Sequence, residues 1–231
     1  MIKKIFEKHE TLMSILLIVL YVVVNSFCMQ NFGLEDYRST IINTVFSIAL
    51  IFLIIKLERV EYYGLTKVKD LKKYLFFIPL VALVLWQFQS GININFPMAQ
   101  IVFHILTMFN IGFLEEIIFR GFLFKMMAKD GLKSAIIVSS LTFGLGHIVN
   151  LLNGADFIPT LMQVCYAVSI GYLFVVIFHK SKSLVPCIVT HSVFNAVSIF
   201  NDGSTSIYIR SIVIIVLSLG FAIYINKTIK E

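Results

Sequence analysis

Long runs of apolar residues, separated by short polar segments, dominate this sequence. A helix needs about 20 mostly apolar residues to cross the ~30 Å of hydrocarbon in a bilayer. By that measure we place about eight spans, at about 11–30, 40–57, 74–90, 98–128, 132–151, 158–178, 184–200 and 208–226. The fourth run is longer than one crossing requires, so we expect it to tilt, protrude or bend near Gly112 or Gly121. The pattern predicts an all-α, polytopic membrane helix bundle.

The basic residues occur mainly in every second polar segment of the chain, at 3–8, 56–73, 125–133, 180–182 and 227–230. The positive-inside rule makes these segments cytoplasmic, which predicts a multi-pass protein of the cell membrane with both termini in the cytoplasm. Arg38 and Arg210 lie in opposite segments, and we expect both side chains to snorkel to the outer interface. No repeat or linker divides the chain, so we expect one transmembrane domain over residues 1–231.

Composition supports the lipid bilayer as the main surroundings of the chain. Of the residues, 58% are hydrophobic and 14% are charged, and the mean hydropathy is +0.91. Soluble domains carry roughly 25% charged residues. The net charge of +6 is explained by the topology, and without a basic cluster on a solvated face we expect no nucleic-acid partner.

Charged groups within the apolar run 98–128 form the first block of candidate chemistry, Phe113 to Gly121. A charge at the bilayer centre costs about 2.5–3.5 kcal/mol on insertion scales, so such groups persist where they pair or react. Glu116 and Arg120 have the i, i+4 spacing of a helical ion pair. Glu115 projects about 100° away and has no basic partner on its helix, which makes it the better candidate for a general base.

The second and third blocks are Phe143 to His147 and His191 to Asn195. Gly144 and Gly146 leave room for a neighbouring backbone. Taken alone, a histidine in an apolar helix, or an imidazole and a carboxamide at i, i+4, is typical of polar contacts between helices.

Depth in the membrane favours a common site for these groups. At ~1.5 Å per residue, Glu115 and His147 both lie about 21 Å from the cytoplasmic ends of their spans. His191 and Asn195 lie about 10 and 17 Å deep. Such a set suits water activation and stabilisation of an oxyanion, as amide hydrolysis requires. We expect His104, about 16 Å from Glu115 along the helix, to make only a polar contact in a wet cavity.

The three blocks resemble the motifs Glu-Glu-x-x-x-Arg, Phe-x-x-x-His and His-x-x-x-Asn of the CAAX protease and bacteriocin-processing family, also called the Abi family. The resemblance covers about residues 110–200 in the family's order. It implies an intramembrane endopeptidase of the glutamate type within a transmembrane helix bundle, with a catalytic core at about 98–200.

The resemblance also implies residue roles. Glu115 and His147 would activate the hydrolytic water, and His191 and Asn195 would stabilise the oxyanion. Supporting roles fall to Glu116, Arg120, Phe119 and Phe143, of which the two phenylalanines would shape the pocket. The Ile-, Lys- and Phe-rich composition suggests an AT-rich bacterial genome. Because bacteria generally lack protein prenylation, we expect a peptide or small membrane-protein substrate.

Several alternatives stay open at the level of sequence. Glu115, His147 and His191 would also suit a zinc ion with an open position, although no His-Glu-x-x-His helix is present, and we expect no metal. Cys187 lies one turn before His191 and is an alternative nucleophile, but an unreactive packed thiol is the simpler reading. A bacteriocin immunity protein or a proton-coupled transporter would use the same residues without hydrolysis.

Overall fold

The computed structural model describes residues 2–66, 77–89, 91–201 and 205–228. Every regular element in these ranges is helical, and no strand occurs in them, which confirms the all-α prediction. The elements are α1 (Ile2–Lys8), α2 (Glu10–Asn31), α3 (Tyr37–Lys56), α4 (Ile78–Trp86), α5 (Met98–Glu116), η2 (Ile117–Phe124), α6 (Lys125–Met127), α7 (Leu132–Gly146), η3 (His147–Leu151), α8 (Phe157–Ser181), α9 (Val185–Ala196), η4 (Val197–Phe200) and α10 (Ile207–Thr228).

Six helices in the described ranges are long and apolar enough to cross a membrane, as expected of a multi-pass protein. They are Glu10–Asn31, Tyr37–Lys56, Met98–Met127, Leu132–Leu151, Phe157–Ser181 and Ile207–Thr228. The predicted run 184–200 gives the shorter helical segment Val185–Phe200. The predicted run 74–90 gives α4, with 9 residues, and its positions 74–76 and 90 lie outside the described residues. The predicted count of eight spans is therefore not confirmed.

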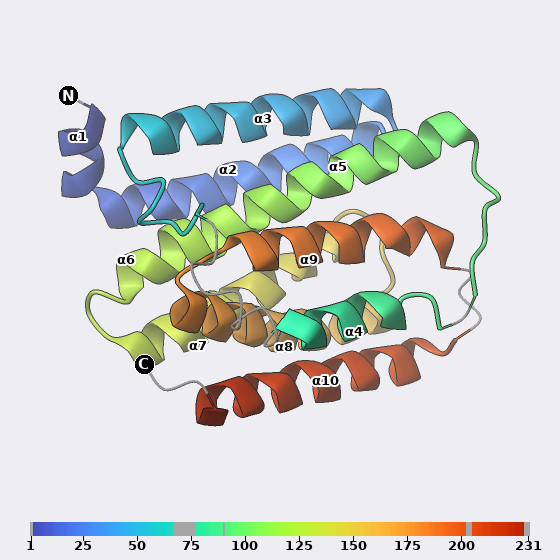
Figure 1. Cartoon of the computed structure of the whole chain (residues 1–231). Helices are drawn as coiled ribbons and strands as arrows, with labels where there is room; N and C mark the ends of the chain where they lie inside the picture. Colours follow the sequence, from blue (N-terminus) through green and yellow to red (C-terminus); the bar gives the residue numbers. More distant parts are fainter. Residues whose placement is uncertain (1, 67–76, 90, 202–204, 229–231) are drawn as a thin grey trace.

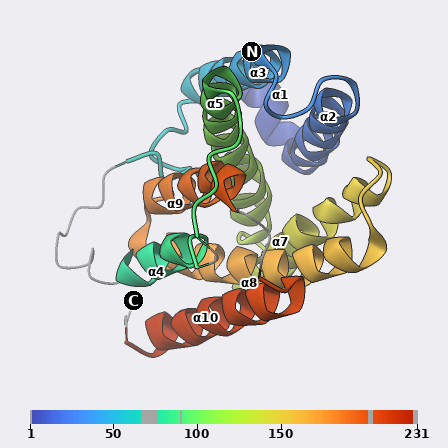
Figure 2. The same ribbon diagram turned by 90° about the vertical axis from the view of Figure 1, so that its right-hand side faces the viewer.

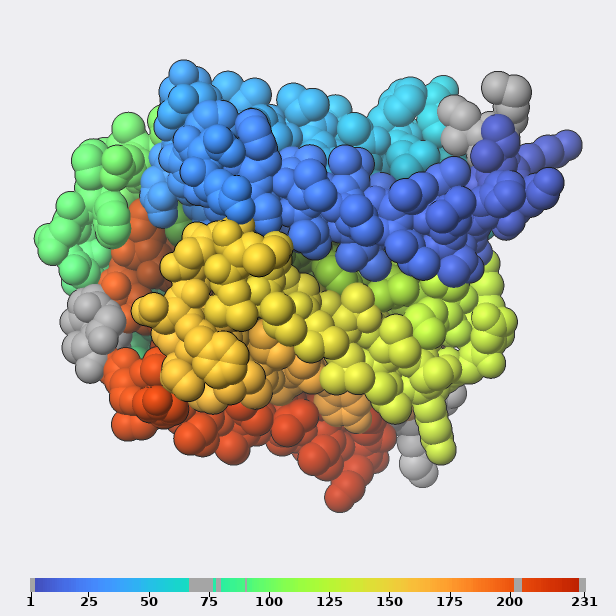
Figure 3. Space-filling view, turned by 180° about the vertical axis from the view of Figure 1, so that it is seen from behind, coloured from blue at the N-terminus to red at the C-terminus, as the bar shows by residue number. Residues whose placement is uncertain are grey.

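The helix formed by α5, η2 and α6 runs through the bundle between two groups of helices (Figure 1). Seen along the bundle, α2 and α3 lie near α5, whereas α7, α8 and α10 form the other side (Figure 2). α9 packs against α5, α4 and α8, so it joins the two groups. From behind, α2 lies beside the segment between η3 and α8 (Figure 3), where Gln30 donates a hydrogen bond of 2.8 Å to Asn153.

Both ends of the described chain, α1 and the carboxyl end of α10, lie at the same end of the bundle (Figure 1). This arrangement agrees with termini on one side of the membrane. Their cytoplasmic orientation stays a prediction.

The long central helix, Met98–Met127, is irregular toward its carboxyl end. It changes from α to π geometry at Ile117 and returns to α geometry at Lys125. Short π-helical segments inside α-helices are often found at functional sites. Gly121, one of the two positions near which a bend was expected, lies in this segment. Gly112 has another role: a Cβ atom there would lie 2.5 Å from Ser192 Oγ, so this glycine allows α5 to touch α9.

The two glycines before His147 differ in their surroundings. A Cβ atom on Gly144 would lie 2.3 Å from Val168 Cγ2 and 2.9 Å from the Val164 carbonyl oxygen, so this glycine lets α7 approach α8. The prediction of close packing is confirmed there. It is wrong for Gly146, where a Cβ atom would meet nothing within 4 Å, because that position borders a cavity between the helices.

These surroundings make Gly144→Ala and Gly146→Ala a matched pair. We expect Gly144→Ala to reduce the free energy of unfolding by about 1–3 kcal/mol, because overpacking forces the helices apart. Gly146→Ala should leave stability unchanged or slightly increased. Thermal unfolding in detergent measures both, and equal midpoints for the two variants would contradict the packing described for α7 and α8.

Candidate active site

Residues of all three motif blocks line one cavity with a volume of about 350 Å³. It lies between α2, α5–η2, α7–η3, α8 and α9, within the bundle. The structure thus brings together the residues predicted to react and the two predicted to shape the pocket: Glu115, His147, His191, Asn195, Phe119 and Phe143. Their catalytic roles stay predictions.

Glu116 and Arg120 form the predicted ion pair. Arg120 Nη1 lies 3.1 Å from Glu116 Oε1, and both side chains are 0% exposed. The guanidinium also lies over the Phe143 ring, 4.0 Å from its centroid. A Cβ atom on Gly171 would lie 3.2 Å from Arg120 Nη2, so a glycine on α8 leaves room for this cation.

His191 connects this pair to Glu115, which the sequence did not reveal. Its Nδ1 lies 2.8 Å from Glu116 Oε1. An ionised carboxylate only accepts hydrogen bonds, so we assign the proton to Nδ1. The other ring nitrogen, Nε2, faces Glu115 Oε2 at 3.3 Å. One imidazole therefore lies between two carboxylates that are adjacent in sequence.

Glu115 has a partner that sequence reasoning missed. The Tyr21 hydroxyl on α2 donates a hydrogen bond of 2.5 Å to Glu115 Oε1. The two residues are 4% and 7% exposed. Tyrosines in membrane helices are enriched at the interfaces, whereas Tyr21 lies near the middle of an apolar run. This unusual position was the one feature of the sequence that could have pointed to a role for Tyr21.

His147 begins η3, at the point where α7 ends. Its ring packs edge-on against Phe143, with centroids 5.5 Å apart. Phe143 also contacts Phe119 and His191 edge-on, at 5.4 and 5.7 Å. The phenylalanine of the second motif therefore separates His147 from the Arg120 side of the site and orients the rings of both histidines.

The end of α9, which carries Asn195, is held by side chains from other helices. Gln87 Nε2 donates to the Phe194 carbonyl at 3.2 Å, and Arg210 Nη2 donates to Gln87 Oε1 at 2.8 Å. Arg210 is half-buried and also lines the cavity. The expectation that it snorkels to the outer interface stays a prediction.

His104 is buried and also reaches the end of α9. Its Nε2 lies 3.4 Å from the Asn195 carbonyl oxygen, and its Nδ1 lies 3.5 Å from Glu35 Oε1. The expected polar contact is therefore confirmed, although His104 is not among the residues that line this cavity.

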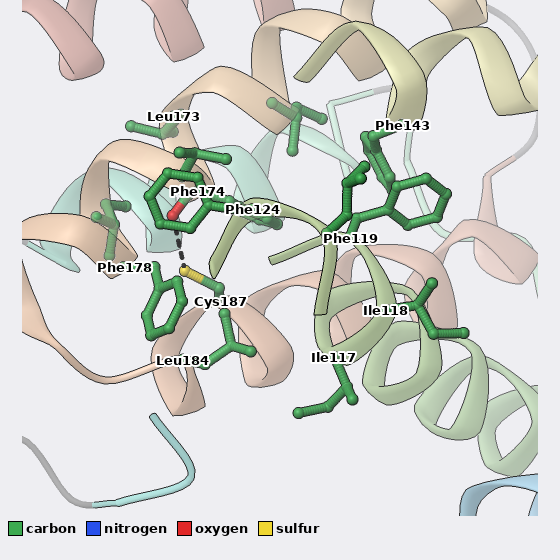
Figure 4. Packing of buried hydrophobic residues seen from close by; sticks show 14 of the residues in the cluster. Ile117, Ile118, Phe119, Phe124, Phe143, Leu173, Phe174, Phe178, Leu184 and Cys187 are labelled. Atoms are coloured by element: carbon green, nitrogen blue, oxygen red, sulfur yellow. Dashed lines mark hydrogen bonds between the residues drawn. The ribbon is translucent and has the colours of Figure 1, made fainter. Parts of the chain in front are cut away.

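Cys187 lies away from the reacting groups. Its thiol is fully buried among Phe174, Phe178 and Leu184 and lies 3.6 Å from the Phe174 carbonyl oxygen, to which it donates (Figure 4). It does not line the cavity. These surroundings agree with a packed thiol and not with a nucleophile.

No group of three or more His, Cys, Asp or Glu side chains is arranged to hold a metal ion among the residues that the structure describes. The contacts with Glu116 and Tyr21 engage Nδ1 of His191 and Oε1 of Glu115 and leave Nε2 and Oε2 facing each other at 3.3 Å. The expectation that no metal is used stays a prediction.

The buried ion pair predicts a strong difference between single and double variants. Arg120→Met should reduce the free energy of unfolding by about 3–5 kcal/mol, because it leaves the Glu116 carboxylate uncompensated. The double variant Glu116→Gln/Arg120→Met should recover much of that loss. Lys3→Met, which breaks the exposed Lys3–Glu58 pair, is the control and should cost no more than about 1 kcal/mol. Denaturation in detergent measures all three, and a double variant as unstable as Arg120→Met would contradict the pairing.

A comparison with known protein families finds one family that matches the part of the chain with these motifs. Residues 97–197 match the family described as Type II CAAX prenyl endopeptidase Rce1-like. The match covers just under half of the chain and contains α5 to α9 with all three motif blocks. No curated protein and no solved structure matches the chain. The resemblance read from the motifs is confirmed over residues 97–197, which are similar to the Rce1-like family of type II CAAX prenyl endopeptidases, a family of membrane proteases.

Proposed function

We propose that this protein is an intramembrane endopeptidase that hydrolyses a peptide bond through an activated water and forms no covalent intermediate. One observation carries the proposal: Glu115, His147, His191 and Asn195, from three separate helices, line a single cavity within the bundle. The similarity of residues 97–197 to a protease family supports it.

In the proposed reaction, Glu115 and His147 orient a water in the cavity. Glu115 Oε2 takes one proton as the water oxygen attacks the peptide carbonyl carbon, and the carbonyl oxygen becomes an oxyanion. When the oxyanion collapses, the C–N bond breaks and the same proton passes to the leaving amine nitrogen. Glu115 is then ionised again and the products are a carboxylic acid and an amine.

His191 and Asn195 act as hydrogen-bond donors to the oxyanion in this scheme. Because Nδ1–H of His191 is donated to Glu116, a donor at Nε2 requires a second ring proton. The resulting imidazolium, together with Arg120, balances the charges of Glu115 and Glu116. A neutral cluster of four charges is the arrangement that low dielectric favours.

The substrate in this proposal is a peptide or a small membrane protein. The cavity lies within the bundle, and its wall combines apolar side chains, including Met108, Ile111 and Phe194, with the amides of Asn25, Asn150 and Gln163. A peptide in extended form would find both apolar contacts and hydrogen-bond partners there.

Replacement of Glu115 tests hydrolysis directly. The probes are two internally quenched peptides of one sequence ending in Cys-aliphatic-aliphatic-X, one of them farnesylated on cysteine and one unmodified. Glu115→Gln in the purified protein should lower kcat at least about 10²-fold, because the general base is lost. Glu58→Gln, at an exposed carboxylate, is the matched control and should retain activity.

Comparison of membrane and secreted peptides from cells with wild type and Glu115→Ala extends the test to natural substrates. Peptide profiles that are identical in the two strains, together with no cleavage of either probe, would contradict proteolysis. If cells that carry the protein with Glu115 and His147 replaced were still protected against a bacteriocin, binding without hydrolysis would explain the protection.

Metal dependence is a separate prediction. We expect purified active protein to contain zinc well below one equivalent and to keep its activity in chelator, because among the described residues Glu115, His147 and His191 are not arranged as a group that could hold a metal ion. Elemental analysis of wild type and His147→Ala measures this. Stoichiometric zinc that disappears in His147→Ala would overturn the metal-free scheme.

A further inference from the structure

Tyr21 reaches the candidate active site from a helix outside the family match. α2 precedes residues 97–197, and the only buried side chains described on it are Ser14, Tyr21 and Cys28. Their spacing of seven residues gives one narrow stripe that faces the protein. Tyr21, in the middle of that stripe, is the one that lines the cavity.

The hydroxyl of Tyr21 distinguishes the two oxygens of Glu115. Oε1 accepts the Tyr21 hydroxyl at 2.5 Å, within the range of charge-assisted O–H···O⁻ bonds. Oε2 accepts no hydrogen bond from the described residues and faces His191 Nε2 at 3.3 Å. One oxygen is thus held by protein, and the other is directed at the imidazole and the cavity.

A carboxylate on a long side chain has freedom about its terminal torsion, which is broad and roughly two-fold. One hydrogen bond at Oε1 removes that freedom when both partners are buried and no bulk water competes. Arg120, a nearby cation, contacts Glu116 and Phe143 and does not hold Oε1 of Glu115 in place of Tyr21. The position of Oε2 therefore depends on α2.

We propose that Tyr21 is a positioning residue, whose hydroxyl holds Oε1 of Glu115 so that Oε2 is the oxygen that takes the proton from water. This inference rests on the proposed function, because it assigns Tyr21 to the same hydrolytic step. It also makes α2 a part of the active site, although the helix is otherwise largely exposed.

Tyr21→Phe removes the hydroxyl and keeps the ring. With the two quenched peptides as probes, we expect kcat to fall about 10–100-fold with KM changed by less than about threefold, since misplacement of a reacting group affects the chemical step. Tyr63→Phe is the matched control and should keep kcat. Tyr63 is also a buried tyrosine, packed against Phe122 at 4.5 Å, and it does not line the cavity.

Incorporation of 3-fluorotyrosine at position 21 should restore most of the lost kcat, because that residue keeps both shape and donor. If Tyr21→Phe fails to fold, the protein with 3-fluorotyrosine at position 21 can still be assayed. Infrared difference spectra give a readout that needs no turnover: the carboxylate band that disappears in Glu115→Gln should shift in Tyr21→Phe and stay in place in Tyr63→Phe.

The outcomes separate the two proposals. A Tyr21→Phe enzyme with unchanged kcat, or an unshifted Glu115 band, would overturn the role of Tyr21 and leave hydrolysis by Glu115 intact. An equal loss of kcat in Tyr63→Phe would overturn it as well, because the effect would then be one of packing. If wild type cleaves and Glu115→Gln cleaves equally, the proposed function itself fails.

Discussion

The ion pair between Glu116 and Arg120 determines how the surrounding helices are arranged. Either charge alone would be costly in a bundle surrounded by lipid, and the contact at 3.1 Å lets each offset the other. The guanidinium requires a flat neighbour and space, which Phe143 on α7 and Gly171 on α8 provide. The carboxylate accepts His191 from α9. Four helical segments are thus oriented around one pair of opposite charges.

From this pair the site is built outward by contacts that no motif contains. His191 is held on one side by Glu116, and the carbonyl end of α9 is held by Gln87 and His104. Gln87 in turn accepts a hydrogen bond from Arg210 on α10. An imidazole and a carboxamide four residues apart share a helix face by geometry alone. Their exact place in the cavity, however, follows from the hydrogen bonds at both ends of their helix.

The sequence predicted the all-α fold, the ion pair and that the three motif blocks meet, because apolar run length and i, i+4 spacing are local properties and similar depth favours a common site. It did not predict that His191 binds Glu116 or that Tyr21 binds Glu115. Those contacts depend on the rotation of one helix against another, and a single sequence carries no signal for rotation when most of its surface is apolar all round. For the same reason, the sequence did not predict that Arg210 binds Gln87 or that His104 contacts the end of α9.

The adjacent carboxylates therefore differ in function through their partners and not through their own chemistry. Glu116 faces a cation and an imidazole and is fully enclosed, whereas Glu115 faces a phenol and the cavity. In the proposed reaction, the proton that neutralises Glu115 leaves behind a hydroxide equivalent whose charge moves to the substrate oxyanion. The net charge of the site is then the same before and after attack. In a low-dielectric interior, where an added net charge is costly, a step that only moves charge between neighbouring groups is favoured over one that creates it.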